Sequence, residues 1–447
     1  MLIGQASINL TANILSALLG LLSVFVFTRL FSPHDYGTYL LGTGFASVIS
    51  VFLAGWFRNL VLSGHARNDG TDVRGLVASG FLLSCLTAPI AYGLGVLTGL
   101  GAAAAVAAIA LSIAIAFFDL TQDLIRARLR AFAVMRGTLV RSAGVLCLGV
   151  LVALVSPTGL VLLLSSTAAC LIAILVQSRT AWRGTMMVFD RADLAALARQ
   201  GLPLTVSLTL LAVSSVADRF VIANLVGAAD AGRYVAALDL VRQTLMLPAM
   251  SAAAALGFAM ISAHVANVVL GADFREIAAQ TMPIVAVAVI FQILTQQYLH
   301  ASFLLSGRNS FYLINTASII VANVILSCVL VESHGTVGAA WARLGADAIG
   351  FLCALVLSRS AFPVPLPAGR LALVMIAALI MALMVGALDR HLHVGDLTAC
   401  IVLACTGFCS YAALCWLFDI SRLRRRLKSG VALLRTKRAN LTIGPSP

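Results

Sequence analysis

Charged residues are scarce in this sequence. Asp, Glu, Lys and Arg make up 11% of the 447 residues, whereas a soluble domain usually contains about a quarter. Hydrophobic residues reach 61%, and the mean hydropathy is +1.02. The shortage of charge excludes an ordinary soluble enzyme or binding module and indicates an integral membrane protein.

Motifs for cofactor chemistry are also missing. No GxxxxGK[ST] phosphate-binding loop occurs, so we expect no ATPase domain in this chain. The nine cysteines show no metal-ligand spacing, and Cys400, Cys405, Cys409 and Cys415 share one apolar run in which thiols act as small hydrophobes. We therefore expect no metal site and no cofactor. The stretches between apolar runs are too short for a soluble domain, so the function must reside in the helices and their connections.

Apolar runs of helical length are abundant. Runs of about 20 residues, enough to cross a bilayer as a helix, recur along the chain. They lack the alternation of strands in an outer-membrane barrel. We predict an all-α integral membrane protein with about 12–14 transmembrane helices. The clearest spans lie near residues 5–30, 38–57, 75–98, 100–120, 138–156, 158–178, 202–226, 281–306, 311–331, 335–358, 371–388 and 397–418.

Basic residues are distributed unevenly across these spans. If the N-terminus is cytoplasmic, most of the 30 Lys and Arg residues lie on the cytoplasmic side, including those of the basic tail at 421–447. This asymmetry follows the positive-inside rule and predicts that both termini are cytoplasmic. The net charge of +13 therefore reflects topology, and we expect no nucleic-acid partner. The tail is either a disordered flank that stops transfer or a segment that rests on anionic lipid headgroups.

Residues 233–270 are difficult to assign. Counting spans from both ends requires an even number of crossings in this segment. Two spans need about 60 Å of helix, and 38 residues supply about 57 Å without any turn. The sequence leaves three interpretations open: a pair of short spans kinked near Pro248, a re-entrant hairpin, or a pair that has lost residues.

A short motif occurs twice, at an offset of 195 residues. LFSPHDYGTY at 30–39 and LVGAADAGRY at 225–234 share a leucine, an aspartate, a glycine and a tyrosine at matching positions. Each copy follows a long span, and six spans separate the copies, so both halves enter the membrane in the same direction. Parallel repeats of this kind pack two bundles around a central cavity, usually in alternating-access transporters.

The stretches TRLFSPHDYGTY and ADRFVIANLVGAADAGRY resemble the polysaccharide-exporter branch of the multidrug/oligosaccharidyl-lipid/polysaccharide flippase superfamily. The resemblance covers nearly the whole chain. It implies a six-helix lobe at 1–200, a second lobe at 201–370 that is shortened at 233–270, and an extra helix pair at 371–420. Family members usually have two full spans and a cytoplasmic loop where this chain offers only 233–270.

The function implied by the resemblance is transport rather than enzymatic catalysis. It implies movement of a polyprenyl-diphosphate-linked oligosaccharide across the bacterial inner membrane, for lipopolysaccharide or exopolysaccharide biosynthesis. Membrane lipids, and polysaccharide polymerase and chain-length proteins, are the partners expected in that setting. The first alternative is a cation-coupled multidrug exporter of the same superfamily. The second is a membrane polymerase or ligase, which the lack of a large external loop argues against.

Two opposite charges stand inside one apolar span. In SSVADRFVIANLVG (214–227), Asp218 and Arg219 are neighbours, so their side chains point about 100° apart on a helix and cannot face each other. Each needs another partner, because an unpaired charge in lipid costs several kcal/mol. We place Arg219 towards the cavity, with Thr205, Thr209, Ala212 and Ser215. Asp218 is either an ion-coupling residue or part of a structural ion pair.

Other polar residues within spans give further candidates. Arg29 either binds diphosphate or extends to headgroups, and Arg343 stands four residues before Asp347, with which it can pair. Asp119 is a second ion-coupling candidate, or else part of a solvated helix extension that also contains Asp123 and Arg126. The predicted substrate-binding residues are Arg219, Arg29, Arg343, Gln292, Gln296 and His300. The last three form one face that either hydrogen-bonds sugar hydroxyls or joins neighbouring helices.

Overall fold

The computed structural model describes residues 2–66, 74–185, 190–246, 252–306, 309–361 and 368–418, and the regular structure of these residues is helical throughout. Ten of the described helices are long and apolar enough to cross a membrane, so the protein is a multi-pass membrane protein. The basic tail at 421–447 and Pro248 lie outside the described residues. The helices are α1 (Leu2–Leu30), α2 (Pro33–Ala66), α3 (Arg74–Cys85), α4 (Ala88–Leu97), α5 (Ala102–Ala127), α6 (Ala131–Val155), α7 (Gly159–Trp182), α8 (Arg191–Leu225), α9 (Ala228–Met246), α10 (Ala252–Val269), α11 (Ala272–Ile293), the π-helix η1 (Leu294–Leu299), α12 (His300–Ser306), α13 (Asn309–Ala361), α14 (Ala368–Asp389) and α15 (Asp396–Leu417).

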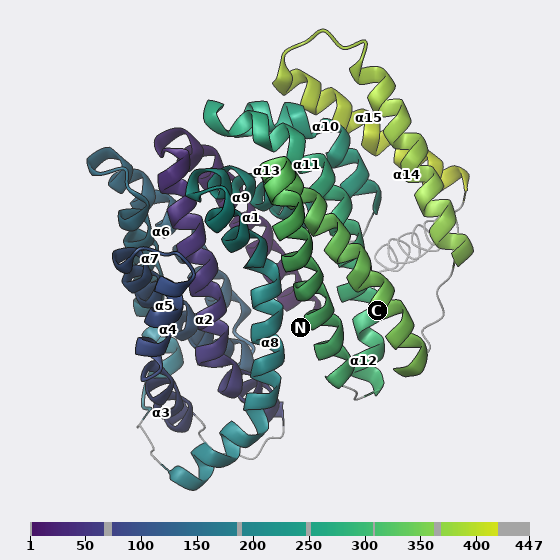
Figure 1. Cartoon of the computed structure of the whole chain (residues 1–447). Coiled ribbons are helices and arrows are strands. Elements are labelled where there is room, and N and C mark those ends of the chain that lie inside the picture. Colours follow the sequence, from purple (N-terminus) through teal and green to yellow (C-terminus); the bar gives the residue numbers. More distant parts are fainter. Residues whose placement is uncertain are drawn as a thin grey trace, which may run out of the picture.

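The helices gather into two groups that follow the chain order (Figure 1). Helices α2, α5, α6 and α7 pack together with α1 on one side of the molecule, and α10, α11 and α13 lie on the other. Helices α2, α8 and α9 pack against one another where the groups meet. The pair α14 and α15 lies at the outer edge against α10, where the ring nitrogens of His264 lie 2.9 Å from Asp389 and 2.7 Å from Asp396. This grouping is compatible with the expected lobes, whose boundaries stay a prediction.

The chain changes direction within two apolar helical stretches. The span near 75–98 consists of α3 and α4, which meet at an angle of 44°. The 53 residues of α13 would extend for about 80 Å if straight, but the chain reverses at Gly335, whose φ of +56° is not helical. Gly338 packs against the backbone of Leu330 after this reversal, so α13 is a tight hairpin that contains both spans predicted at 311–331 and 335–358.

The difficult segment at 233–270 forms two separate helices, α9 and α10. Helix α9 begins at Ala228, directly after α8. It therefore includes residues before 233 that we had expected to form a loop between spans. Its 19 residues extend for about 28 Å, close to the thickness of the hydrocarbon core. Two short helices are therefore the outcome, and residues 247–251 between them lie outside the described part of the chain.

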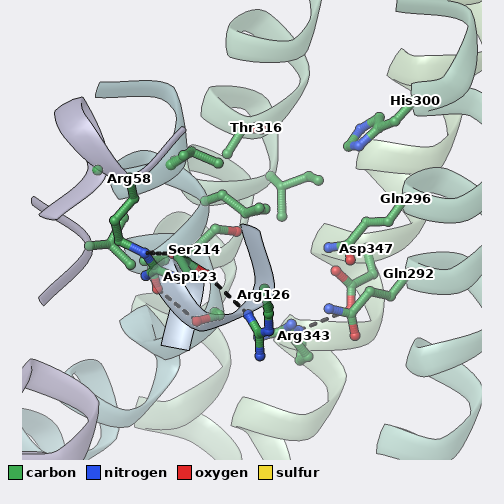
Figure 2. A pocket seen from close by; sticks show the side chains of 17 residues that line it. Arg58, Asp123, Arg126, Ser214, Gln292, Gln296, His300, Thr316, Arg343 and Asp347 are labelled. Carbon is green, nitrogen blue, oxygen red and sulfur yellow. Dashed lines mark hydrogen bonds and ion pairs between the residues drawn. The ribbon is translucent and has the colours of Figure 1, made fainter. Parts of the chain in front are cut away.

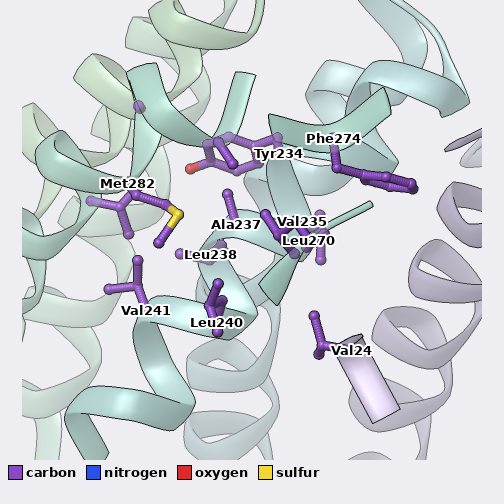
Figure 3. Packing of buried hydrophobic residues seen from close by; sticks show 14 of the residues in the cluster. Val24, Tyr234, Val235, Ala237, Leu238, Leu240, Val241, Leu270, Phe274 and Met282 are labelled. Carbon is purple, nitrogen blue, oxygen red and sulfur yellow. The ribbon is translucent and has the colours of Figure 1, made fainter. Parts of the chain in front are cut away.

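Helix α9 lies at the centre of the largest hydrophobic cluster. Its residues Tyr234–Val241 include side chains that are at most 1% exposed, and they pack on Leu270, Phe274 and Met282 (Figure 3). Charged residues that lower its hydropathy pair with other protein residues. Arg233 donates to Asp230 over 2.9 Å, and Asp239 accepts from Arg219. A helix this polar is stable within a bilayer because protein, not lipid, surrounds it.

The two copies of the repeated motif touch each other. Gly37 at the start of α2 faces Gly232 at the start of α9, so closely that an added Cβ on either glycine would meet backbone of the other copy. A second contact joins the same end of the bundle. Arg29 at the end of α1 donates to the carbonyls of Val268 (2.9 Å) and Val269 (2.6 Å) at the end of α10. We name this end of the bundle, where α1 ends and α2 begins, the Gly37 end.

Replacing Gly232 with leucine is expected to lower the melting temperature in detergent clearly and to open the Gly37 end. The added side chain meets Pro33 and Gly37 backbone atoms, which cannot yield as a flexible side chain would, and overpacking typically costs about 1–3 kcal/mol. Gly93→Leu is the matched control, because nothing lies within 4 Å of a Cβ at that position. Equal melting temperatures for both variants would contradict the close packing of the motifs.

Candidate functional site

A cavity of about 570 Å³ lies between the two groups of helices. Helices α2 and α5 form one wall, α11, η1 and α12 form the opposite wall, and α8 and α13 complete it. Figure 2 shows Arg58, Asp123 and Arg126 facing Gln292, Gln296 and His300 across this space. We name it the first cavity. It is lined by Val51, Gly55, Arg58, Asp123, Arg126, Leu208, Leu211, Ala212, Ser214, Ser215, Gln292, Gln296, His300, Thr316, Ile319, Arg343 and Asp347.

One wall of the first cavity carries charge. Arg58 on α2 donates to Asp123 over 2.7 Å and to Asp119 over 3.0 Å, both on α5. Asp123 also accepts from Arg126, one turn further along α5, over 3.1 Å. The Arg126 side chain is 52% exposed, whereas that of Asp123 is 2% exposed. Both arginines are therefore held in place by the deeply buried carboxylate of Asp123, and Arg126 remains accessible to a ligand.

The opposite wall is polar and carries no charge while His300 is neutral. Gln292 lies in the last turn of α11, Gln296 lies in the π-helix η1, and His300 begins α12. In a regular α-helix each four-residue step advances by about 40°. The wider π turn reduces this advance, so the three side chains keep to one face. His300 is fixed by Asn315, whose Oδ1 lies 2.9 Å from Nε2 and whose amide donates to the Gly350 carbonyl over 2.7 Å.

A buried ion-pair network joins α8 to α13. Arg343 donates to Asp347 over 2.9 Å and to Asp218 over 3.3 Å, and the Tyr234 hydroxyl donates to Asp218 over 3.2 Å. Asp218 is 0% exposed. The guanidinium of Arg343 is shared by two carboxylates, and the expected pairing of Arg343 with Asp347 is confirmed.

Arg219 has a different partner from its neighbour. It donates to Asp239 on α9 over 3.0 Å, while its backbone N–H donates to the Asp218 carboxylate. The prediction that the two adjacent side chains serve different faces is confirmed. We expected Arg219 to face the cavity together with Ala212 and Ser215. Ala212 and Ser215 do line the first cavity, but Arg219 does not.

The structure thus brings together only some of the predicted site residues. Arg343, Gln292, Gln296 and His300 line one cavity. Asp218 and Asp119 are in ion pairs and do not belong to the lining, and Arg29 caps α10 at the Gly37 end. The roles in substrate binding and ion coupling stay predictions.

Sequence reasoning missed Arg58, Asp123 and Arg126 as cavity residues. They were treated as topology signals and as a solvated helix end because they lie near the ends of their spans. Asp119, Asp123 and Arg126 do share one helical face, and that periodicity was the available signal. Among the described residues, no His, Cys, Asp and Glu side chains form a group of three or more that suits a metal ion.

Comparisons with known proteins agree with this architecture. The lipid II flippase MurJ, in an inward closed conformation, aligns with a TM-score of 0.75 at 13% identity over 92% of this chain and 98% of its own. A multidrug resistance MATE transporter of the MOP superfamily, in an outward-facing conformation, aligns with a TM-score of 0.51 at 14% identity over 80% of this chain and 95% of its own. The MATE multidrug transporter DinF-BH gives the same TM-score, 0.51, at 14% identity and with the same coverage of both chains. At such identities the likeness shows the fold alone.

Sequence comparison gives the family. No curated protein matches the sequence. Residues 3–265, more than half of the chain, match the family model described as polysaccharide biosynthesis protein. The chain therefore belongs to the polysaccharide biosynthesis protein family.

Proposed function

We propose that this protein is a flippase that moves a polyprenyl-diphosphate-linked oligosaccharide across the bacterial inner membrane. The observation that carries the proposal is the first cavity, with arginines on one wall and a row of amide and imidazole groups on the other. Arginine suits diphosphate because its planar guanidinium donates two parallel hydrogen bonds to phosphate oxygens. The neutral wall suits a ligand whose remaining polar groups are hydroxyls.

The charge balance of the first cavity also favours an anionic ligand. Three arginines and two aspartates line it, which leaves an excess of one positive charge. Both aspartates already pair with arginines. A diphosphate entering beside Arg126 can accept from guanidinium N–H groups that do not donate to Asp123, because each arginine has five N–H donors. The buried carboxylate of Asp123 then keeps its arginine partners, which limits the electrostatic cost of binding.

The positive-inside rule supports a direction for this movement. Arg58 and Arg126 lie near the end of the bundle opposite the Gly37 end, and by the positive-inside rule that end is cytoplasmic. The diphosphate would enter there while the polyprenyl tail stays in the lipid. At the Gly37 end, contacts of Gly37 with Gly232 and of Arg29 with α10 close the path. Alternating access would then require these contacts to separate.

A cation-coupled multidrug exporter is the alternative, and the MATE-like fold fits it. An exporter of cationic drugs needs carboxylates that are free to pair with its ligand. Among the described lining residues, Asp123 and Asp347 are both engaged by arginines. The lining therefore favours the anionic ligand over a cationic one.

Ligand-dependent stabilisation distinguishes the two functions. We expect a short-chain polyprenyl diphosphate to raise the melting temperature of the detergent-purified protein in a concentration-dependent manner, because a ligand that binds only the folded state stabilises it. We expect no shift with a cationic rhodamine dye. A shift with the dye and none with the diphosphate would favour the exporter and overturn the proposal.

A further inference from the structure

A second cavity of about 800 Å³ lies further along the bundle. It is enclosed by α1, α2, α5, α6 and α7, with α9 contributing Asp239 and Gln243. Hydroxyl groups dominate its polar lining: Ser16, Ser23, Thr43, Ser47, Thr138, Ser142, Ser166, Tyr36 and Tyr39. The second cavity is therefore chemically distinct from the first, whose polar lining is rich in arginine.

One face of α2 connects the two cavities. Tyr36, Leu40, Thr43 and Ser47 line the second cavity, and Val51, Gly55 and Arg58 line the first. These positions follow one another at steps of three and four residues, which is the spacing of a single helical face. A ligand held at Arg58 therefore has a continuous surface leading towards the Gly37 end.

An ion pair stands between the two spaces. Arg219 donates to Asp239, which lines the second cavity, and the Arg219 side chain lies next to Gly44 in the middle of the connecting face of α2. Ser215, one turn before Arg219 on α8, lines the first cavity. The Arg219–Asp239 pair thus marks the boundary between the cavities.

The polar groups of the second cavity suit a ligand rich in hydroxyls. Asp239 is paired with Arg219. Arg141, the one arginine among the described residues that line this cavity, lies over the ring of Phe118 at 5.1 Å, and its N–H groups can donate to sugar oxygens. Ser16 and Ser142 join α1 to α6 by a hydrogen bond of 2.7 Å. Hydroxyls both donate and accept, so this lining can exchange hydrogen bonds with sugar hydroxyls in either direction.

A buried acceptor in the second cavity has no hydrogen-bond donor among the described residues. The Oε1 atom of Gln243 is buried and accepts no hydrogen bond from the described residues. The Gln243 side chain packs against Gly20 and lines the second cavity. A buried acceptor without a donor costs about 1–3 kcal/mol, and a ligand hydroxyl would remove that cost.

We infer that the second cavity is a carbohydrate-binding site that receives the glycan part of the substrate while Arg58 and Arg126 hold its diphosphate. This inference rests on the proposed function. It assigns the diphosphate to the first cavity and the glycan to the second cavity, which are connected along α2. For the glycan to pass from one cavity to the other, the Arg219–Asp239 ion pair must separate.

The test compares two ligands on the purified full-length protein. The affinity of a short-chain polyprenyl diphosphate is measured with and without an attached disaccharide. We expect the disaccharide to strengthen binding to the wild-type protein by about tenfold or more, as for a site that hydrogen-bonds substrate hydroxyls. Ser142→Leu and Gln243→Leu should each abolish this gain and leave binding of the bare diphosphate lipid within about twofold. Cys147→Leu, which adds the same side chain at an exposed position of α6, should keep the gain.

Two other outcomes would contradict the inference, and one of them would also contradict the proposed function. If the wild-type protein binds both lipids equally, or if the gain survives Ser142→Leu and Gln243→Leu, the second cavity is not the glycan site, although the proposed function stands. If the protein binds neither lipid, the proposed function falls together with the inference. Melting temperatures of all variants show whether a loss of binding is a loss of folding.

Discussion

Replacing Arg58 with glutamine is expected to slow translocation of a polyprenyl-diphosphate-linked oligosaccharide by about tenfold to a hundredfold. Arg58 is fixed by Asp119 and Asp123 and lines the first cavity, where its guanidinium can turn to phosphate oxygens. A hydrogen bond to a charged group contributes about 1.5–3 kcal/mol, and each 1.4 kcal/mol changes an equilibrium constant tenfold. The rate is measured in liposomes as the loss of labelled lipid from one leaflet.

Two controls separate binding from folding. Arg136→Gln removes an arginine from α6 that donates to the Val176 carbonyl and lies outside the first cavity, so its rate should stay within about twofold of wild type. The double variant Arg58→Gln/Asp119→Asn keeps the local charge balanced and should remain as slow as Arg58→Gln. A double variant as fast as wild type would show that Arg58 serves only to neutralise Asp119.

Replacing Arg343 with methionine is expected to cause the largest loss of stability. Arg343 is shared by Asp218 and Asp347, and all three side chains are at most 5% exposed. Its removal leaves two buried carboxylates without a cation. Breaking a buried pair from one side typically costs about 3–5 kcal/mol, and this change breaks two. We expect little folded protein after purification, measured by size-exclusion chromatography and by the melting temperature in detergent.

The matched control is Arg233→Met on α9. Arg233 also pairs with an aspartate, Asp230, but its side chain is 31% exposed and that of Asp230 is 26% exposed, so the loss should be about 1 kcal/mol or less. Asp218→Asn should fall between the two variants, since Arg343 keeps Asp347. Similar melting temperatures for Arg343→Met and Arg233→Met would contradict a structural role for the network.

Most of the fold could be predicted from the sequence because the features that identify a transmembrane helix are local. Apolar runs of bilayer length locate most spans, and the four-residue spacing of Arg343 and Asp347 predicts their pairing. Helix α9 was not recognised in this way because its four charged residues lower its hydropathy. The three-residue spacing of Asp230 and Arg233 permits their pairing, but the pairing of Asp239 with Arg219 on α8 only becomes visible in three dimensions. The reversal at Gly335 falls where the predicted span at 311–331 ends and the predicted span at 335–358 begins, so this break was predicted.

The candidate site was harder to predict because its contacts are distant in sequence. Asp218 and Arg343 are separated by 125 residues, and Arg58 and Asp119 by 61. The charge of Arg58 was explained by topology alone, although the same residue also lines a cavity. Helical spacing predicted that Asp218 and Arg219 diverge, but it could not identify Arg343 and Asp239 as their partners.

Translocation in liposomes tests the central claim most directly. Purified protein is reconstituted with a fluorescent polyprenyl-diphosphate-linked disaccharide, and an impermeant quencher reports how much of the probe is on the outer leaflet. We predict that the protein exposes probe from the inner leaflet faster than protein-free liposomes do, and that Arg58→Gln removes most of this acceleration. A wild-type rate equal to that of protein-free liposomes, with the protein folded and correctly inserted, would contradict the assignment as a flippase.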